Sequence, residues 1–373
     1  MLHLKKNIDW VLFFLLIPIL GAGLITMKAF DASSSHIFIK QLVWIGISLA
    51  VFFIFSFIDF RFLKRTDILV GIFLFFCGLL VLLFGLGHIA KGAQKWFSFG
   101  GFSFQPADMM KLVLVIVLSK YFSRRHVEIA DFKHILISGL YTLVPFALVI
   151  IQPDFGSAMI IFFVWLGMIL VSGISKKHLL IVFGIGALCF FMLWTFAFRT
   201  YQKERILTFV NPLTDIHGSG YNVNQSIIAV GSGQMLGKGV GFGTQSRFQF
   251  LPESQTDFIF AAFAEEWGFV GTLLLLILYG LVIWRILKIA MVGATNFEVL
   301  FGMGVAILFM SHIFINIGMN IGVLPVTGIP LPFMSYGGSH LLTEFMALGI
   351  LMGMRQYSRA AHRDDLKHEF LGI

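Results

Sequence analysis

Long runs of apolar residues alternate with short polar segments along almost the whole chain. The hydrocarbon core of a bilayer is about 30 Å thick, so a helix needs roughly 20 apolar residues to cross it. Most of the runs reach that length, and the fourth is shorter. The pattern predicts an all-α polytopic membrane protein with ten transmembrane helices, over residues 10–29, 38–58, 68–87, 109–122, 135–151, 157–173, 179–198, 258–287, 298–317 and 338–354.

The lysines and arginines of the short connections predict the orientation of these helices. Cytoplasmic loops carry an excess of Lys and Arg. With the N-terminus inside, the clusters at 5–6, 61–65, 124–133, 176–177 and 285–288 all become cytoplasmic. Both termini are therefore predicted to be cytoplasmic, and the long polar segment 199–257 faces outward.

Composition supports a membrane protein and excludes several other classes. The chain has 373 residues, of which 58% are hydrophobic and 12% charged, whereas soluble domains carry roughly 25% charged residues. The net charge of +8 comes from short basic clusters between apolar runs, a pattern that indicates topology rather than nucleic-acid binding. Cys77 and Cys189 both lie in apolar runs, so we expect no disulfide framework. The spans leave no room for a soluble domain, and residues 1–373 are predicted to form one integral membrane domain.

The outward segment 199–257 ends in the sequence LPESQTDF, which leads into the eighth predicted span. Thr256 is a plausible N-cap, and Asp257 then falls in the first helical turn, where the helix dipole favours a carboxylate by about 0.3–1 kcal/mol. Simple capping would explain this aspartate. Its place beside a long outward loop that supplies cations favours a catalytic role instead.

Three other acidic residues have two interpretations each. Glu265 and Glu266 lie further along the eighth span, and we favour a structural role in which they bond the backbone of a broken helix over a functional one. Asp154 lies in a tight turn between the fifth and sixth spans. Asp154 or Ser157 is expected to cap the sixth helix, and a role for Asp154 in lining a cavity stays open.

Four outward cations, Lys40, Lys95, Lys111 and Arg205, are candidates for binding an anionic ligand. Lys111 lies inside the fourth span, where an uncompensated charge costs a few kcal/mol, so it needs a partner or an anionic ligand. Lys40 and Lys95 lie closer to the interface and could snorkel. If they converged, these cations would form a pyrophosphate site.

Two outer connections and a glycine-rich run have distinctive sequences. Residues 91–106 indicate a re-entrant or interfacial loop, and the prolines of 322–332 exclude regular helix there. Such backbone survives at membrane depth only where protein or a water-filled cavity satisfies it. The glycine-rich segment 231–244 lacks the Gly-Lys-Ser/Thr ending of a nucleotide-binding loop, which excludes nucleotide binding.

Taken in order, the motifs resemble the SEDS (shape, elongation, division and sporulation) family. The resemblance covers almost the whole chain, and within the family it is strongest to the elongation branch. The motifs that carry it lie at 105–111, 152–156, 201–206, 211–212, 218–226, 244–246, LPESQTDFIFA (251–261), 265–266, PVTGIPLPF (325–333) and 335–339.

The resemblance implies a peptidoglycan glycosyltransferase that polymerises lipid II at the outer face of the cytoplasmic membrane during cell elongation. It implies as partners a class B penicillin-binding protein, which crosslinks the product, and other membrane proteins of the elongation complex. A division or sporulation role is the alternative within the family. No organic cofactor is implied, and a divalent cation, Mg²⁺ or Mn²⁺, between Asp257 and the pyrophosphate stays open.

The resemblance also assigns site residues. The family's essential acid falls on Asp257, which would act as the base, and Glu253 in the same turn is a further candidate. Two departures from the family pattern occur: Lys40 and Lys95 stand where arginine is frequent, and Ala107-Asp108 replaces Ser-Glu. The positions that line the family's cavity fall on Lys40, Lys95, Gln105, Lys111, Asp154 and Arg205.

Two other classes compete with the enzyme. A lipid-linked precursor flippase would spread its polar residues over both sides of the bilayer midplane, whereas here they crowd the outer half. A scaffold that only positions a crosslinking partner would leave the charge of Lys111 and the mouth around Asp257 without a purpose. The sequence therefore favours chemistry at the outer surface.

Overall fold

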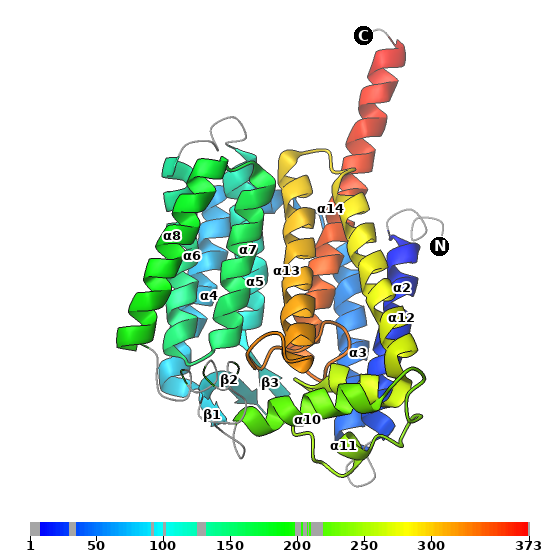
Figure 1. The fold of residues 1–373 in the computed structure, drawn as a ribbon. Helices are drawn as coiled ribbons and strands as arrows, with labels where there is room; N and C mark the ends of the chain where they lie inside the picture. Colours follow the sequence, from blue (N-terminus) through cyan, green and yellow to red (C-terminus); the bar gives the residue numbers. More distant parts are fainter. Residues whose placement is uncertain are drawn as a thin grey trace.

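The computed structural model describes residues 8–29, 35–90, 93–99, 102–124, 132–197, 203, 207, 209 and 219–371. Its long helices run side by side as a bundle (Figure 1). They are α2 (Trp10–Ala29), α3 (Ser35–Ser56), α4 (Thr66–Leu86), α5 (Pro106–Ser123), α6 (Phe132–Ile151), α7 (Phe155–Ser172), α8 (Lys176–Met192), α12 (Ile259–Ala290), α13 (Asn296–Asn320) and α14 (Gly338–Leu371). The shorter elements are η1 (Phe60–Lys64), η2 (Leu193–Ala197), α10 (Ser219–Ser232), α11 (Thr244–Arg247), β1 (His88–Ala90), β2 (Ala93–Phe99) and β3 (Phe102–Phe104).

Each predicted span coincides with one of the long helices. The first matches α2 at both ends, the ends of most others are shifted by a few residues, and α14 runs on to Leu371. In the described part of the chain, seven helices are long and apolar enough to cross a membrane, and α5, α8 and α14 are not among them. The helical, multi-pass architecture is confirmed, and the count of ten spans stays a prediction. Both termini lie at one end of the bundle, and α10, α11 and the strands lie at the other (Figure 1).

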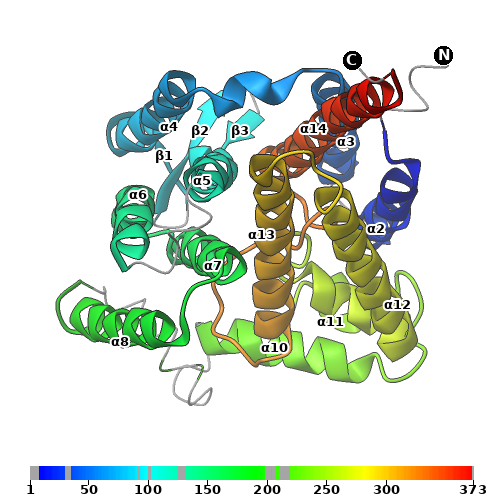
Figure 2. The ribbon, with the colours of Figure 1, turned by 90° about the horizontal axis from the view of Figure 1, so that it is seen from above.

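Helix α5 is the central element of its half of the bundle. Seen along the bundle, it is surrounded by α4, α6, α7 and α13 (Figure 2). Side chains on every face of α5 are buried, including the charged Asp108 and Lys111. A helix with no lipid-facing side does not need an apolar surface, which explains why its sequence is the least typical of the predicted spans.

The long segment before α12 and the loop before α5 are more regular than the sequence predicted. Where we expected a re-entrant or interfacial loop at 91–106, the chain forms an antiparallel sheet in the order β1-β2-β3. Phe97 is buried and the next residue, Ser98, is exposed, which is the alternation of a half-buried strand. The described part of the outward segment 199–257 contains α10 and α11.

An ion cluster joins three helices at the end of the bundle where the termini lie. Asp9, just before α2, accepts hydrogen bonds from Arg285 of α12 at 2.9 and 2.8 Å and from Arg355 of α14 at 2.6 Å. Burial of Asp9 opposes ionisation, but the hydrogen bonds and charges of the two arginines hold the pKa of its carboxyl below the ordinary value. Arg285 belongs to the cluster at 285–288 that the sequence places on the cytoplasmic side.

Candidate active site

Asp257 lies in a tight turn just before α12, at the end of the bundle remote from the termini. The helix begins at Ile259 with Phe258 as its N-cap, so Thr256 does not cap it, contrary to the prediction. The Thr256 hydroxyl instead donates to the Glu253 carboxylate at 2.9 Å. The amides of Thr256 and Phe258 both donate to the Glu253 carbonyl at 3.1 Å, and this turn displaces the helix start.

Two buried asparagines of α13 hold the backbone at Asp257. The side-chain amides of Asn316 and Asn320 donate to the Asp257 carbonyl oxygen at 2.9 and 3.1 Å. Asn320 Oδ1 also accepts the Ala261 amide at 3.0 Å, one of the N–H groups that the start of a helix leaves unpaired. These bonds attach the start of α12 to α13, and Asp257 itself remains half-buried.

The proline-rich stretch between α13 and α14 is non-helical, as predicted, and protein groups satisfy its backbone. Asn316 donates to the Ile329 carbonyl at 2.7 Å, and the Tyr279 hydroxyl donates to the Pro332 carbonyl at 2.6 Å. The amide of Phe333 donates to a carboxylate oxygen of Glu344 at 2.9 Å. Irregular backbone is tolerated among membrane helices only with such partners.

This stretch separates Asp257 from the turn that carries Asp154. Gly328 has a φ of +70°, and a Cβ at that position would lie 3.4 Å from Asp257 Oδ2. On the other side, a Cβ at Gly156 would lie 2.6 Å from the Thr327 carbonyl oxygen. The close approach requires glycine at position 156, the positive φ favours it at position 328, and the loop is in contact with both turns.

Three predicted site residues come together around Asp154. Its carboxylate accepts a hydrogen bond from Gln105 Nε2 at 2.9 Å and pairs with Lys95 Nζ at 3.4 Å. Asp154 is also the N-cap of α7 and accepts the Ser157 amide at 3.4 Å, so the predicted capping is confirmed. Burial raises the pKa of Asp154, but the charges of Lys95 and then Lys111 outweigh it and hold that pKa below the ordinary value.

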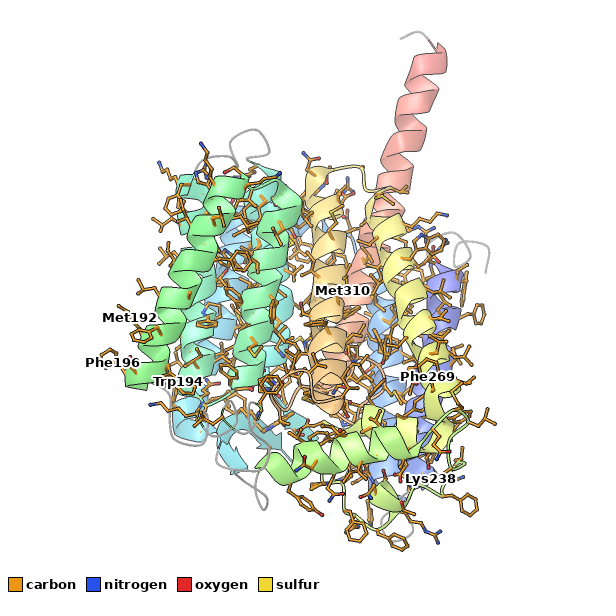
Figure 3. The ribbon with its side chains drawn as sticks, viewed as in Figure 1. Met192, Trp194, Phe196, Lys238, Phe269 and Met310 are labelled. Atoms are coloured by element: carbon orange, nitrogen blue, oxygen red, sulfur yellow. The ribbon has the colours of Figure 1, made fainter. Side chains whose placement is uncertain are left out.

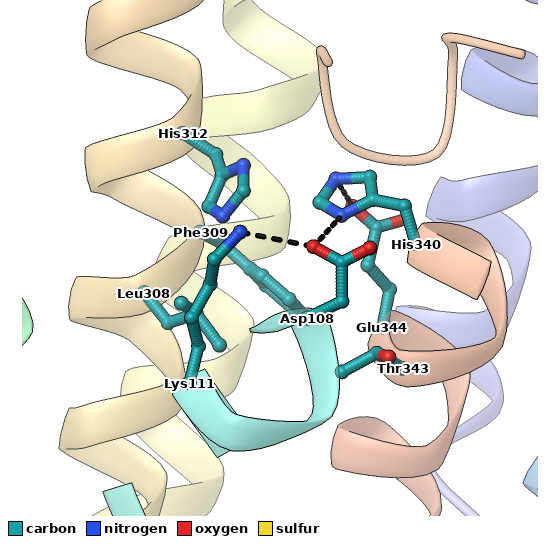
Figure 4. Close-up of a pocket in the computed structure, with 8 residues that line it drawn as sticks. All are labelled: Asp108, Lys111, Leu308, Phe309, His312, His340, Thr343 and Glu344. Atoms are coloured by element: carbon teal, nitrogen blue, oxygen red, sulfur yellow. Dashed lines mark hydrogen bonds and ion pairs between the residues drawn. The ribbon is translucent and has the colours of Figure 1, made fainter. Parts of the chain in front are cut away.

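Lys111 lies in a buried polar cluster between α5, α13 and α14 (Figure 4). Its ammonium donates to Asp108 Oδ1 at 2.9 Å, and His340 Nδ1 lies 3.6 Å from the same oxygen. His340 Nε2 lies 2.9 Å from Glu344 Oε1, and the His312 and His340 rings are 4.7 Å apart. The cavity between them, about 10 Å³, holds no more than about one water molecule. Lys111 has the partner that its position required, and only 3% of it is exposed.

The other predicted site residues are more dispersed. Lys40 is exposed on α3, and Glu253 is exposed in the turn before Asp257, with a φ of +53°. Arg205 lies outside the described residues. Within the described ranges, no group of three or more His, Cys, Asp or Glu side chains has the arrangement of a metal site.

Glu265 and Glu266 lie at a break in α12, as the structural interpretation predicted. The helix is interrupted at Gly268, where φ is +65° and ψ is −165°. The amides of Lys238 and Gly239 donate to the carbonyls of Glu265 and Glu266, each at 3.0 Å. The glycine-rich segment 231–244 therefore packs against the interruption.

The side chains of the two glutamates hold the same region. Glu265 Oε1 accepts from Lys238 Nζ at 2.7 Å and from the Gln245 amide at 3.0 Å, and Oε2 accepts from the Ser246 amide at 3.3 Å. Glu266 Oε1 accepts the Gly241 amide at 2.6 Å. The Glu265 carboxylate therefore holds α11, and the Glu266 carboxylate holds the glycine-rich segment.

The sequence analysis did not include the polar residues on α13 and α14. Asn316 and Asn320 are four residues apart on α13, and His340 and Glu344 are four residues apart on α14. Residues at this spacing face the same side of a helix. Polar pairs within apolar spans are functional candidates by default, so this spacing was the signal that could have found them.

Comparison with known proteins gives consistent matches along the chain. The family model described as "Cell cycle protein" (FtsW/RodA/SpoVE) matches residues 6–360. The stage V sporulation protein E of Bacillus subtilis is 35% identical over 95% of this chain and 99% of its own length. The peptidoglycan glycosyltransferase MrdB of Escherichia coli is 38% identical over 75% of this chain and 76% of its own length.

Two solved structures have the same fold. One, from a study of how a peptidoglycan synthase complex coordinates polymerization and crosslinking, has a TM-score of 0.80 and 30% identity over 94% of this chain and 98% of its own. The other is the rod shape determining protein RodA of Thermus thermophilus, with a TM-score of 0.70 and 28% identity over 93% of this chain and 96% of its own.

Proposed function

The chain belongs to the FtsW/RodA/SpoVE family, also called SEDS, and from this we propose that it is a peptidoglycan glycosyltransferase that polymerises lipid II on the outer side of the cytoplasmic membrane. The observation that carries the proposal is the setting of Asp257 at the start of α12. Its carboxylate is half-buried, and Asn316 and Asn320 hold its backbone carbonyl. The group of Lys95, Gln105 and Asp154 lies across the 325–332 loop.

The chemistry is a single inverting displacement. The donor sugar of lipid II is α-linked to a pyrophosphoryl lipid, and the product linkage is β-1,4. The 4-hydroxyl oxygen of the acceptor forms a bond to the anomeric carbon as the bond from that carbon to the pyrophosphate oxygen breaks. The hydroxyl proton passes to the Asp257 carboxylate, a contribution typically worth about 10²- to 10⁴-fold in rate. Undecaprenyl diphosphate leaves.

The leaving pyrophosphate needs positive charge near the outer end of the bundle. Lys95 is suited to this because its side chain is 24% exposed, and it pairs with Asp154 through one oxygen. Lys40 and Arg205 complete the proposed set. As lysines, residues 40 and 95 act as point charges and cannot form the bidentate fork of arginine.

Lys111 has an indirect role in this proposal. Its ammonium is buried and paired with Asp108, so it does not reach a sugar-sized ligand. Its charge nevertheless acts on Asp154, whose pKa it lowers. Lys111 thereby helps to keep the Asp154 carboxylate ionised and able to orient Lys95 and Gln105.

A divalent cation is compatible with this site but not required by it. Mg²⁺ prefers oxygen ligands and is commonly bound by one or two carboxylates together with substrate phosphates. The Asp257 carboxylate would be the protein ligand, with Glu253 in the same turn as a second candidate. Such an ion would neutralise charge on the departing pyrophosphate.

The proposed cellular role is cell elongation, in a complex with a class B penicillin-binding protein that crosslinks the new strands. The similarity to MrdB and to the rod shape determining protein RodA supports elongation. The match to the structure from a peptidoglycan synthase complex supports the partner. A sporulation role is the second candidate, because the stage V sporulation protein E matches along 99% of its length.

The test is polymerisation of purified lipid II by the protein co-purified with its cognate class B partner. Moenomycin in the assay silences contaminating class A polymerases. Wild type should make long glycan strands, and Asp257→Asn should make none at an equal protein level. Full activity of Asp257→Asn would refute the base assignment. If neither protein made strands while reconstituted vesicles still moved lipid II across the bilayer, the flippase alternative would replace the enzyme.

A further inference from the structure

The glycine-rich segment carries a row of outward-facing apolar side chains at residues 235–242. Leu236 is 81% exposed and Phe242 is 65% exposed, and Met235 and Val240 are also exposed. The segment thus combines permissive glycines with large apolar groups. Exposed apolar side chains concentrated in one short segment are typical of a contact with a membrane or another protein.

Backbone hydrogen bonds fix the level of this segment along α12. The amides of Phe269 and Val270 donate to the carbonyls of Gln234 and Met235 at 2.8 and 3.1 Å. The Leu236 backbone also packs directly on Gly268, where a Cβ would lie 2.7 Å from the Leu236 carbonyl carbon. Residues 234–236 therefore lie beside the first turn of the α12 portion that follows the break.

That level falls at the edge of the hydrocarbon core. Arg285 lies at the opposite end of the bundle, where it binds Asp9 beside the termini. Phe269 precedes Arg285 by 16 residues, which is about 24 Å at 1.5 Å per residue. The hydrocarbon core is about 30 Å thick. Phe269 therefore lies within the outer part of that core or at its boundary.

The surface of α12 at this level is already a lipid-facing surface. Phe269, Leu273 and Leu274 are exposed apolar residues of a helix that is long and apolar enough to span the bilayer. Figure 3 places Phe269 and Lys238 at the same end of the bundle. The Lys238 ammonium is turned back to Glu265, so it does not bring an unpaired charge to the apolar row.

We propose that residues 235–242 insert into the membrane leaflet remote from the termini, with Leu236 and Phe242 among the upper parts of the acyl chains. The occupant of this surface is phospholipid, because the apolar row continues the lipid-facing surface of α12 at a depth that lipid occupies. Segments that lie in the interface bind through buried apolar area in this way. Glu265 and Glu266 then attach this segment to the rest of the protein through their hydrogen bonds to Lys238 and Gly241.

The experiment measures the depth of position 236 in the full-length protein. Leu236→Cys is introduced with Cys77→Ala and Cys189→Ala, labelled with the environment-sensitive fluorophore NBD and reconstituted into phosphatidylcholine and phosphatidylglycerol vesicles. The same background carries two reference sites. Leu274→Cys on α12 reports acyl chains, and Thr295→Cys, at the exposed start of α13 with no side-chain cap bond, reports water.

The expected result is a blue-shifted emission at position 236 that lipids brominated on the upper acyl chain quench at least as strongly as at position 274, which lies about 8 Å deeper along α12. Emission like that at position 295 would overturn the proposal. A blue shift without quenching would also overturn it, because protein rather than lipid would then cover the segment. If Leu236→Cys does not fold, Phe242→Cys provides the same measurement.

Discussion

Replacement of Glu265 by alanine should release the chain between the break in α12 and α11. The carboxylate accepts the backbone amides of Gln245 and Ser246 at 3.0 and 3.3 Å, and it is fully buried. A buried donor left without a partner costs about 1–3 kcal/mol. The two amides together therefore lose about 2–6 kcal/mol. Since each 1.4 kcal/mol is a factor of ten, local opening should become at least about 30-fold more frequent.

Hydrogen–deuterium exchange with mass spectrometry measures this opening directly. Peptides that cover 238–250 should exchange faster in Glu265→Ala, and peptides from 270–290 should serve as an unchanged internal reference. The matched control is Lys238→Arg. It keeps a cation beside the fully buried Glu265 carboxylate, where the native ammonium is 29% exposed, and it leaves both amide bonds in place, so the control should change exchange by less than about tenfold.

The reasoning fails in either of two ways. Unchanged exchange across 238–250 in Glu265→Ala would mean that the carboxylate does not hold the segment. An equal increase in Glu265→Ala and Lys238→Arg would mean that the contact with the residue 238 side chain, and not the pair of amides, supplies the stability. Glu265→Gln should lie between the two, because it keeps one carbonyl oxygen as an acceptor.

Three further predictions concern the site and its supports. Asn316→Ala removes the hydrogen bonds to the carbonyls of Asp257 and Ile329 and should lower kcat for lipid II polymerisation by about 100-fold. A kcat within twofold of wild type would show that the position of Asp257 does not depend on Asn316. Gly268→Ala would place a Cβ 2.2 Å from a backbone nitrogen of the glycine-rich segment, at a φ of +65°, and should abolish the yield of folded protein in size-exclusion chromatography. Gly280→Ala on the same helix, where a Cβ would have nothing within 4 Å, should leave that yield unchanged. Equal yields for the two variants would contradict the close approach. The folded pKa of Asp154 is depressed, so the stability that its carboxylate contributes is present above the unfolded pKa of about 3.9 and is lost as pH falls through the folded value. The melting temperature should therefore fall in acid for wild type and change less for Asp154→Asn. Parallel curves of melting temperature against pH for the two proteins would refute this.

Much of the architecture follows from the sequence because lipid imposes a simple rule. An apolar run of sufficient length must form a helix, and the first predicted span coincides with α2 (Trp10–Ala29) without any shift. The cap at Asp154 and the non-helical proline-rich stretch also follow from local chemistry. These features depend on a few neighbouring residues, which the sequence displays directly.

Features that depend on distant contacts were less predictable. Hydropathy could not show that α5 is surrounded by other helices, since the polar cluster around Lys111 is completed by residues of α13 and α14. The start of α12 was displaced because the Glu253 carbonyl closes a turn before it. The convergence of Lys95, Gln105 and Asp154 joins a strand and two helix ends, and no spacing along the chain reveals such a meeting.

The complete burial of α5 has a consequence for how the protein enters the membrane. His340 is synthesised some 230 residues after Lys111, and at about 5–20 residues per second it arrives roughly 10–50 s later. During that interval a lone Lys or Asp at the centre of a helix would oppose insertion by about 2.5–3.5 kcal/mol. Asp108 lies one turn before Lys111 on the same helix and pairs with it at 2.9 Å. Nascent α5 therefore carries its own counterion into the translocon, before the helices that will enclose it exist.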